Sequence, residues 1–142
     1  MKKYFIVAGE PSGDLHGSKL IKAIKHLNPN SSFMGHGGDS MRNEGMHIIE
    51  HVDSLAIMGF AEVLRHLPRM NKIMRNTVGA IERSKPDRVI LIDYPGFNLR
   101  LAKRLSPLKI PITYFILPQA WAWKQRRVEV LKRFIAVSYT HL

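Results

Sequence analysis

The stretch RVILIDYPGFN, residues 88–98, decides the fold of this chain. After Arg88 come four aliphatic residues in a row, which is typical of a strand buried on both faces of a sheet. The turn-forming residues from Asp93 onward end that strand, and helical spacing follows over residues 97–105. A buried strand that leads directly into a helix is the repeating unit of an α/β domain.

The same alternation extends in both directions along the chain. Further strands are expected at residues 3–8 (KYFIVA), 32–35, 47–49 and 112–116. Helices are expected over 14–27 with Asp14 as the cap, after Asp39 as the cap of a short helix, over 59–83 with a new first turn at Pro68, and over 123–134. Strands separated by helices imply right-handed crossovers. We therefore predict an α/β fold: a Rossmann-like, mainly parallel sheet with helices on both faces.

Length and composition favour one globular domain. The 142 residues are 45% hydrophobic and 23% charged, enough for one core and too few for two domains of ordinary size. No apolar run approaches the roughly 18 residues of a membrane span, and the run after Lys3 is too short for a signal peptide. The lack of cysteine excludes disulfides in this chain and fits the cytoplasm. The seven histidines lack metal-site spacing, so no metal is expected.

The charge balance is strongly basic, with 22 Lys and Arg against 11 Asp and Glu and a net charge of +11. Such a surplus favours an anionic partner, which can be a nucleic acid, a phosphorylated metabolite or an acidic membrane surface. Composition alone leaves all three open.

Three polar clusters follow predicted strands. They occupy residues 9–14 (GEPSGD), 93–98 (DYPGFN) and 118–123 (PQAWAW). Ligands of open parallel sheets bind outside the carboxyl ends of the strands, so a parallel sheet brings these clusters to one edge. We expect the functional site there.

Each cluster also has a purely structural interpretation. The first places small residues before a helix, where an anion can bind, but Ser12 or Asp14 can simply cap that helix. Burial of Asp93 at the end of its strand would raise the pKa of the carboxyl toward that of a general base, but Asp93 can equally cap the next helix. Asn98 can orient a ligand hydroxyl or end a turn.

An apolar stretch with interleaved cations covers residues 57–74. A flexible apolar face flanked by basic residues describes a helix lying in a membrane interface, and equally a core-facing helix with a solvated basic side. The apolar residues in question include Met58, Phe60, Val63, Leu64, Leu67 and Met70, and the cations include Arg65, Arg69 and Lys72.

Taken together, these segments resemble the lipid-A-disaccharide synthase family. The resemblance rests on AGEPSGDLHG (8–17), GGDSMRNEGM (37–46), MGFAEVL (58–64), IDYPGFN (92–98) and PQAWAWKQRRV (118–128). Five motifs in the same order and spacing cover about residues 4–136, which makes a chance likeness very improbable.

The resemblance implies the N-terminal, acceptor-side half of a GT-B glycosyltransferase, in which two Rossmann-like domains face each other across a cleft. Such enzymes join UDP-2,3-diacylglucosamine to 2,3-diacylglucosamine 1-phosphate with inversion, and release UDP. Neither metal nor another cofactor is expected, and nucleic acid is not a partner. The expected location is cytoplasmic, peripheral on the inner face of the cytoplasmic membrane, whose anionic surface the basic chain would contact.

The resemblance also implies roles for single residues. Asp93 matches the motif aspartate and is the candidate base for the acceptor 6-hydroxyl. Glu10, Ser12, Gly13, Asn98 and Gln119 are expected to line the substrate site. The membrane-docking residues are expected to be Met58, Phe60, Val63, Leu64, Leu67 and Met70.

Two departures from the family pattern stand out. Family members are more than twice this length, and their second domain carries most UDP-sugar contacts, so the chain alone is expected to be inactive. Residues 137–142 (VSYTHL) do not follow the family. We therefore assign residues 1–136 to the acceptor-side domain and expect residues 137–142 to be a non-native tail.

Three other interpretations stay open at this point. The charge suits a nucleic-acid-binding module, although no basic stripe interleaved with exposed aromatics is evident. A non-catalytic nucleotide- or sugar-phosphate-binding domain would carry a glycine fingerprint after its first strand and an acidic residue ending its second, and neither is present. The chain can also be an inert piece of a longer gene product.

Overall fold

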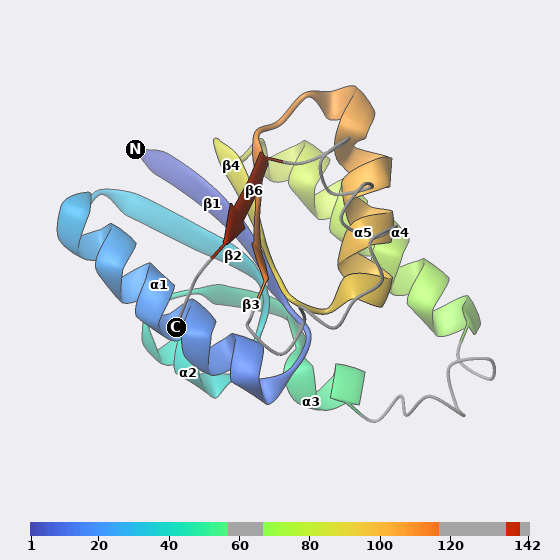
Figure 1. Ribbon diagram of the computed structural model, residues 1–142, viewed down its shortest axis with the longest axis horizontal. Helices are drawn as coiled ribbons and strands as arrows, with labels where there is room; N and C mark the ends of the chain where they lie inside the picture. Colours follow the sequence, from blue (N-terminus) through green and yellow to red (C-terminus); the bar gives the residue numbers. More distant parts are fainter. Residues whose placement is uncertain (57–66, 117–135, 140–142) are drawn as a thin grey trace.

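The computed structural model describes residues 1–56, 67–116 and 136–139. Its centre is a six-stranded sheet in the order β3-β2-β1-β4-β5-β6, and every neighbouring pair is parallel (Figure 1). The strands are β1 (Lys2–Ala8), β2 (Ser31–Gly37), β3 (His47–His51), β4 (Arg88–Ile92), β5 (Ile112–Ile116) and β6 (Ala136–Tyr139). The strand order reverses between β1 and β4, the place where doubly wound sheets bind ligands.

Helices cover both faces of the sheet, as Figure 1 shows. They are α1 (Pro11–Leu27), α2 (Asp39–Asn43), α3 (Val52–Ala56), α4 (Leu67–Ser84) and α5 (Pro95–Leu105), followed by the short 3-10 helix η1 (Ser106–Leu108). One core cluster joins α1 and α2 to the sheet, and the other joins α4 and α5 to its opposite face. The predicted Rossmann-like α/β class is confirmed.

The central strands are buried because both faces are covered. Phe5, Ile6, Val7 and Ala8 of β1 have no exposed surface, and successive residues alternate between the two clusters. Full burial of a large apolar side chain contributes roughly 1.5–3 kcal/mol, so this run supplies much of the drive to form the sheet.

Helix starts differ from the sequence prediction. α1 begins at Pro11, with Glu10 in the N-cap position, and the fixed φ of proline suits the first turn. α2 has Gly38 in the N-cap position, so Asp39 belongs to its first turn. The predicted capping roles of Asp14 and Asp39 for their own helices are therefore wrong.

Parts of the chain that the sequence assigned otherwise also belong to the fold. The short helix α3 was not expected, and α4 starts at Leu67 while residues 57–66 lie outside the described residues. Residues 137–139, which the sequence analysis set apart from the domain, pair with β5 in β6. Their non-native origin stays a prediction. Among the described helices, none combines the length and apolar character needed to cross a membrane.

Candidate functional site

Two of the three predicted polar turns meet at the carboxyl edge of the sheet. Ala8 at the end of β1 pairs with Ile92 at the end of β4, so the 9–13 turn and the 93–98 turn start side by side. They also touch, because a β-carbon on Gly9 would lie 2.4 Å from ring carbons of Tyr94. The expected proximity of these two turns is confirmed, whereas residues 118–123, with Gln119, lie outside the described residues.

The backbone at Asp93 is held in an unusual conformation. Asp93 and Tyr94 both have left-handed φ, 45° and 50°, which costs an L-residue roughly 1–2 kcal/mol each. The amide of Asp93 donates to the Phe115 carbonyl at 2.9 Å, and the Asp93 carbonyl accepts from the Tyr114 hydroxyl. The neighbouring strand β5 thus fixes the direction in which the chain leaves β4. Tyr94, not Asp93, occupies the N-cap position of α5.

The buried Asn98 side chain stabilises the same turn through hydrogen bonds. This side chain is fully buried, and its Nδ2 donates to the Asp93 carbonyl at 2.8 Å and to the Ile92 carbonyl at 3.3 Å. A weaker contact of 3.5 Å reaches the Val7 carbonyl, so one amide joins the ends of β4 and β1. Asn98 has no exposed surface and holds the turn, and its predicted role in substrate contact stays a prediction.

The start of α1 faces this turn with exposed polar groups. Glu10 and Ser12 are exposed and Gly13 is buried. The N-cap residue Glu10 makes no side-chain hydrogen bond to α1. The amides of a first helical turn have no intrahelical acceptor and lie at the positive end of the helix dipole. Burial raises the pKa of the Tyr94 phenol above its usual range, and the nearby Glu10 carboxylate raises it further.

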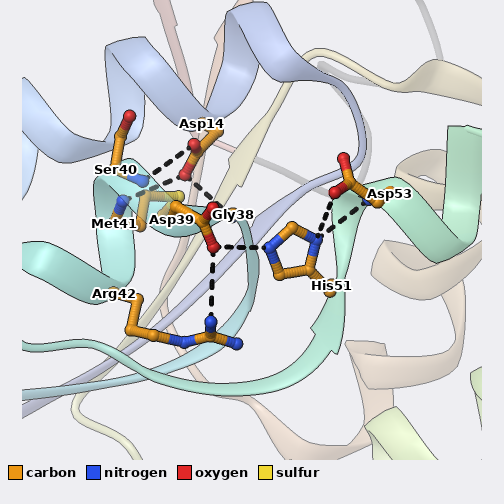
Figure 2. A network of polar contacts seen from close by, with 8 residues as sticks. All are labelled: Asp14, Gly38, Asp39, Ser40, Met41, Arg42, His51 and Asp53. Carbon is orange, nitrogen blue, oxygen red and sulfur yellow. Dashed lines mark hydrogen bonds and ion pairs between the residues drawn. The ribbon is translucent and has the colours of Figure 1, made fainter.

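Asp14 links this turn to the next one along the edge. Its buried carboxylate accepts from the amides of Gly38 at 2.8 Å, Ser40 at 3.1 Å and Met41 at 3.0 Å (Figure 2). Asp14 therefore caps α2 from α1. The approach leaves no space at Gly38, where a β-carbon would lie 2.6 Å from Asp14 Oδ2.

A surface network extends the polar edge to β3. His51 Nδ1 accepts from the Asp53 amide at 3.1 Å, which leaves Nε2 to donate to Asp39 at 3.0 Å, and Arg42 lies 3.3 Å from the same carboxylate oxygen (Figure 2). The hydrogen bond from His51, aided by the positive charge of Arg42, holds the pKa of the Asp39 carboxyl below its usual range. His51 was not predicted as a site residue, because its only signal is its place at the end of β3.

No metal centre is evident in the part of the chain that the structure describes. Among those residues, no group of three or more His, Asp and Glu side chains is arranged to hold an ion.

The predicted docking stretch is described only in part. Met58, Phe60, Val63 and Leu64 lie outside the described residues, and Leu67 begins α4. Met70 is half-buried and packs against the core cluster, in which Ile73 and Met74 are buried, and its assignment to a membrane contact stays a prediction. The cations Arg69, Lys72 and Arg75 lie on the exposed side of α4.

Similar proteins share both the sequence and the fold. A family model described as lipid-A-disaccharide synthetase matches residues 4–138. Lipid-A-disaccharide synthases of Myxococcus xanthus and Coxiella burnetii are each 38% identical over 94% of this chain, and that of Alkalilimnicola ehrlichii is 42% identical over 92%. The aligned part is 35%, 36% and 34% of those proteins, so the chain spans about a third of their length.

Solved structures with the same fold are more distant in sequence. The UDP-GlcNAc 2-epimerase of Neisseria meningitidis, in complex with UDP-GlcNAc, superposes with a TM-score of 0.60 at 12% identity, over 95% of this chain and 38% of its own. A putative UDP-N-acetylglucosamine 2-epimerase of Listeria monocytogenes gives 0.60 at 8%, over 98% and 38%. At these identities the likeness supports the Rossmann-like fold alone. The match of the family model over nearly the whole chain, with the motif turns in contact at the sheet edge, shows that the chain belongs to the lipid-A-disaccharide synthetase family.

Proposed function

We propose that residues 1–136 are the acceptor-side domain of a glycosyltransferase of lipid A biosynthesis, the N-terminal half of a GT-B enzyme. The reaction joins UDP-2,3-diacylglucosamine to 2,3-diacylglucosamine 1-phosphate and releases UDP. The observation that supports this most is the contact between the 9–13 and 93–98 turns, which carry family motifs at the point where the strand order reverses.

Asp93 is the proposed base. Its carboxylate takes the proton of the acceptor 6-hydroxyl while that oxygen forms a bond to the anomeric carbon of the donor. The bond between this carbon and the UDP oxygen breaks from the opposite side, so the anomeric centre inverts and UDP carries away the electron pair. This chemistry requires no metal, and the second domain would hold the UDP-sugar.

The geometry around Asp93 suits a group that must stay in one place. A general base has to lie within hydrogen-bond reach of its proton, so a small shift in backbone direction would remove it from the reaction. Two backbone dihedrals in the left-handed region are fixed by Asn98, Tyr114 and Phe115. We assign Asn98 a positioning role on this basis.

The start of α1 would form the acceptor pocket. Glu10 and Ser12 are exposed beside the Asp93 turn, and Gly13 is buried, where an added β-carbon would lie 3.2 Å from the Ala8 β-carbon. Free amides at a helix N-terminus favour an anion, and the acceptor carries a 1-phosphate. Gln119 would border the cleft from the third motif.

Membrane contact is the remaining part of the proposal. The reacting lipids lie in the inner membrane, and the chain has a net charge of +11. Met58, Phe60, Val63, Leu64 and Leu67 would dock the protein on the cytoplasmic face, with the exposed cations of α4 near the anionic headgroups.

The test is Asp93→Asn in the full-length protein that contains this chain. Loss of a general base reduces turnover by about 10²-fold or more, and kcat should fall with little change in KM for the acceptor. Asp87→Asn is the matched control, because Asp87 is exposed and bonds the Lys3 amide at the opposite edge of the sheet. Near-normal turnover of Asp93→Asn would remove Asp93 from the mechanism.

A further inference from the structure

A separate cavity of about 160 Å³ lies between α4 and the strands β2 and β3. Its polar lining comes from His36, Glu50, Asn76, Thr77 and Arg83. None of these residues belongs to the 9–13 or 93–98 turn, so the cavity is distinct from the proposed transfer site.

His36 lines the cavity, and its ring has a buried nitrogen without a hydrogen-bond partner among the described residues. The Thr77 hydroxyl donates to the Ile73 carbonyl at 2.6 Å, so it must accept from His36 Nε2 at 2.9 Å. Burial lowers the pKa of His36 to about 4, which leaves the ring neutral with Nδ1 as its unprotonated acceptor. Among the described residues, none donates to this Nδ1, although His36 is only 1% exposed.

A hydrogen-bond donor from a ligand would stabilise this unpaired acceptor. A buried polar atom without a hydrogen bond costs roughly 1–3 kcal/mol, and native proteins seldom leave one unmatched. The side chain of Glu50, half-buried, and those of Asn76 and Arg83, exposed at the mouth, also have no partner within the described part of the chain. The residues that line the cavity therefore include a carboxylate, an amide and a guanidinium in addition to the imidazole.

The size and the chemistry of the lining define the ligand class. An engineered cavity of about 150 Å³ accommodates benzene, so this space admits a six-membered ring. His36 Nδ1 and Glu50 accept hydrogen bonds, Arg83 donates and Asn76 does both. A hydroxyl group pairs with all of them, since it donates once and accepts twice. An inorganic anion would instead meet the Glu50 carboxylate.

We propose that this cavity binds a small polyhydroxylated ring, of the size of one sugar or cyclitol, at a site distinct from the transfer site.

The first experiment follows the His36 ring in the full-length protein by long-range proton–nitrogen NMR, with His36→Gln to assign the signal. Titration with myo-inositol should shift the Nδ1 resonance in a saturable way. Cyclohexanol, the same ring with one hydroxyl, should bind at least tenfold more weakly, and inorganic phosphate should leave the resonance unchanged.

The second experiment uses matched variants. Arg83→Met and Glu50→Gln should each weaken myo-inositol binding at least tenfold, whereas Arg75→Met and Glu82→Gln, exposed on α4 and outside the cavity, should change it less than twofold. The proposal is overturned by the absence of a saturable shift, which means water alone fills the cavity. Equal affinity for cyclohexanol, or a phosphate shift that Arg83→Met abolishes, also overturns it. These ligand comparisons on the unaltered protein decide the matter even if a variant fails to fold.

Discussion

At the scale of single residues, the burial of His36 links stability to pH. The ring packs beside Phe5 and Phe97 with almost no exposure, and its pKa is lowered to about 4 from the ordinary 6.5. Between these two values the unfolded chain binds a proton at this position and the folded chain does not. Stability rises with pH wherever the unfolded state binds more protons. Burial of the neutral His36 ring therefore costs no stability above pH 6.5, and it lowers the free energy of unfolding progressively as the pH falls toward 4.

We expect the free energy of unfolding to drop by about 3 kcal/mol over this interval because of His36 alone, at 1.36 kcal/mol for each tenfold change in affinity for the proton. Urea unfolding at a series of pH values, compared between the wild type and His36→Leu, measures the effect. Asp39 loses its stabilising interaction at lower pH in both proteins, so only the difference between the curves reports His36. Two parallel curves would contradict the prediction.

The roles of individual residues were predictable only where they follow from neighbours in sequence. Asp93 could be singled out because it ends a run of apolar residues. Asp14 could not be recognised as the cap of α2, because the amides it binds lie 24 to 27 positions away. The hydrogen bonds by which Asn98 joins the ends of β1 and β4 could not be predicted either, because Val7 lies 91 positions away in the sequence.

At the scale of secondary structure, apolar strands were easier to predict than helix starts. The strand β5 begins and ends where its apolar run does, because burial on both faces depends on composition. Helices α1, α2 and α5 begin without a side-chain cap of their own, so the usual capping signals placed their starts incorrectly. For the stretch 57–74, the amphipathic pattern fits core and membrane alike, and packing of Ile73 and Met74 assigns its second part to the core.

The proposed docking segment can be tested by removing apolar surface. We expect Leu64→Ser combined with Leu67→Ser to weaken binding of the full-length protein to phosphatidylglycerol-containing vesicles at least tenfold, since each leucine side chain transferred out of water contributes roughly 1.5–3 kcal/mol. Vesicle co-sedimentation measures the partitioning, with circular dichroism to confirm the fold. Leu27→Ser is the control, because Leu27 is 84% exposed at the end of α1. Unchanged partitioning of the double variant would place these leucines in the core.

At the scale of the whole molecule, the described residues form a sheet with helices on both faces, in a chain that spans about a third of its relatives. The sheet and its two core clusters are present, and so is the turn that carries the proposed base. The relatives are about three times as long as the aligned part. The resemblance implies a second domain that holds the UDP-sugar, because family members are more than twice as long as this chain, and this division stays a prediction.

This division leads to a prediction about turnover. An enzyme that holds both reactants in the right geometry gives the reaction an effective molarity of about 10⁵–10⁸ M. A domain that positions only the acceptor does not provide this rate enhancement. The 142-residue chain should therefore show turnover at least 10⁴-fold below that of a protein in which the remaining two thirds of a relative follow residue 136. A coupled assay of UDP release measures both, with Asp93→Asn in the longer protein to set the background. UDP release by the short chain within tenfold of the longer protein would mean that the donor also binds within these residues, and the acceptor-side assignment would fail.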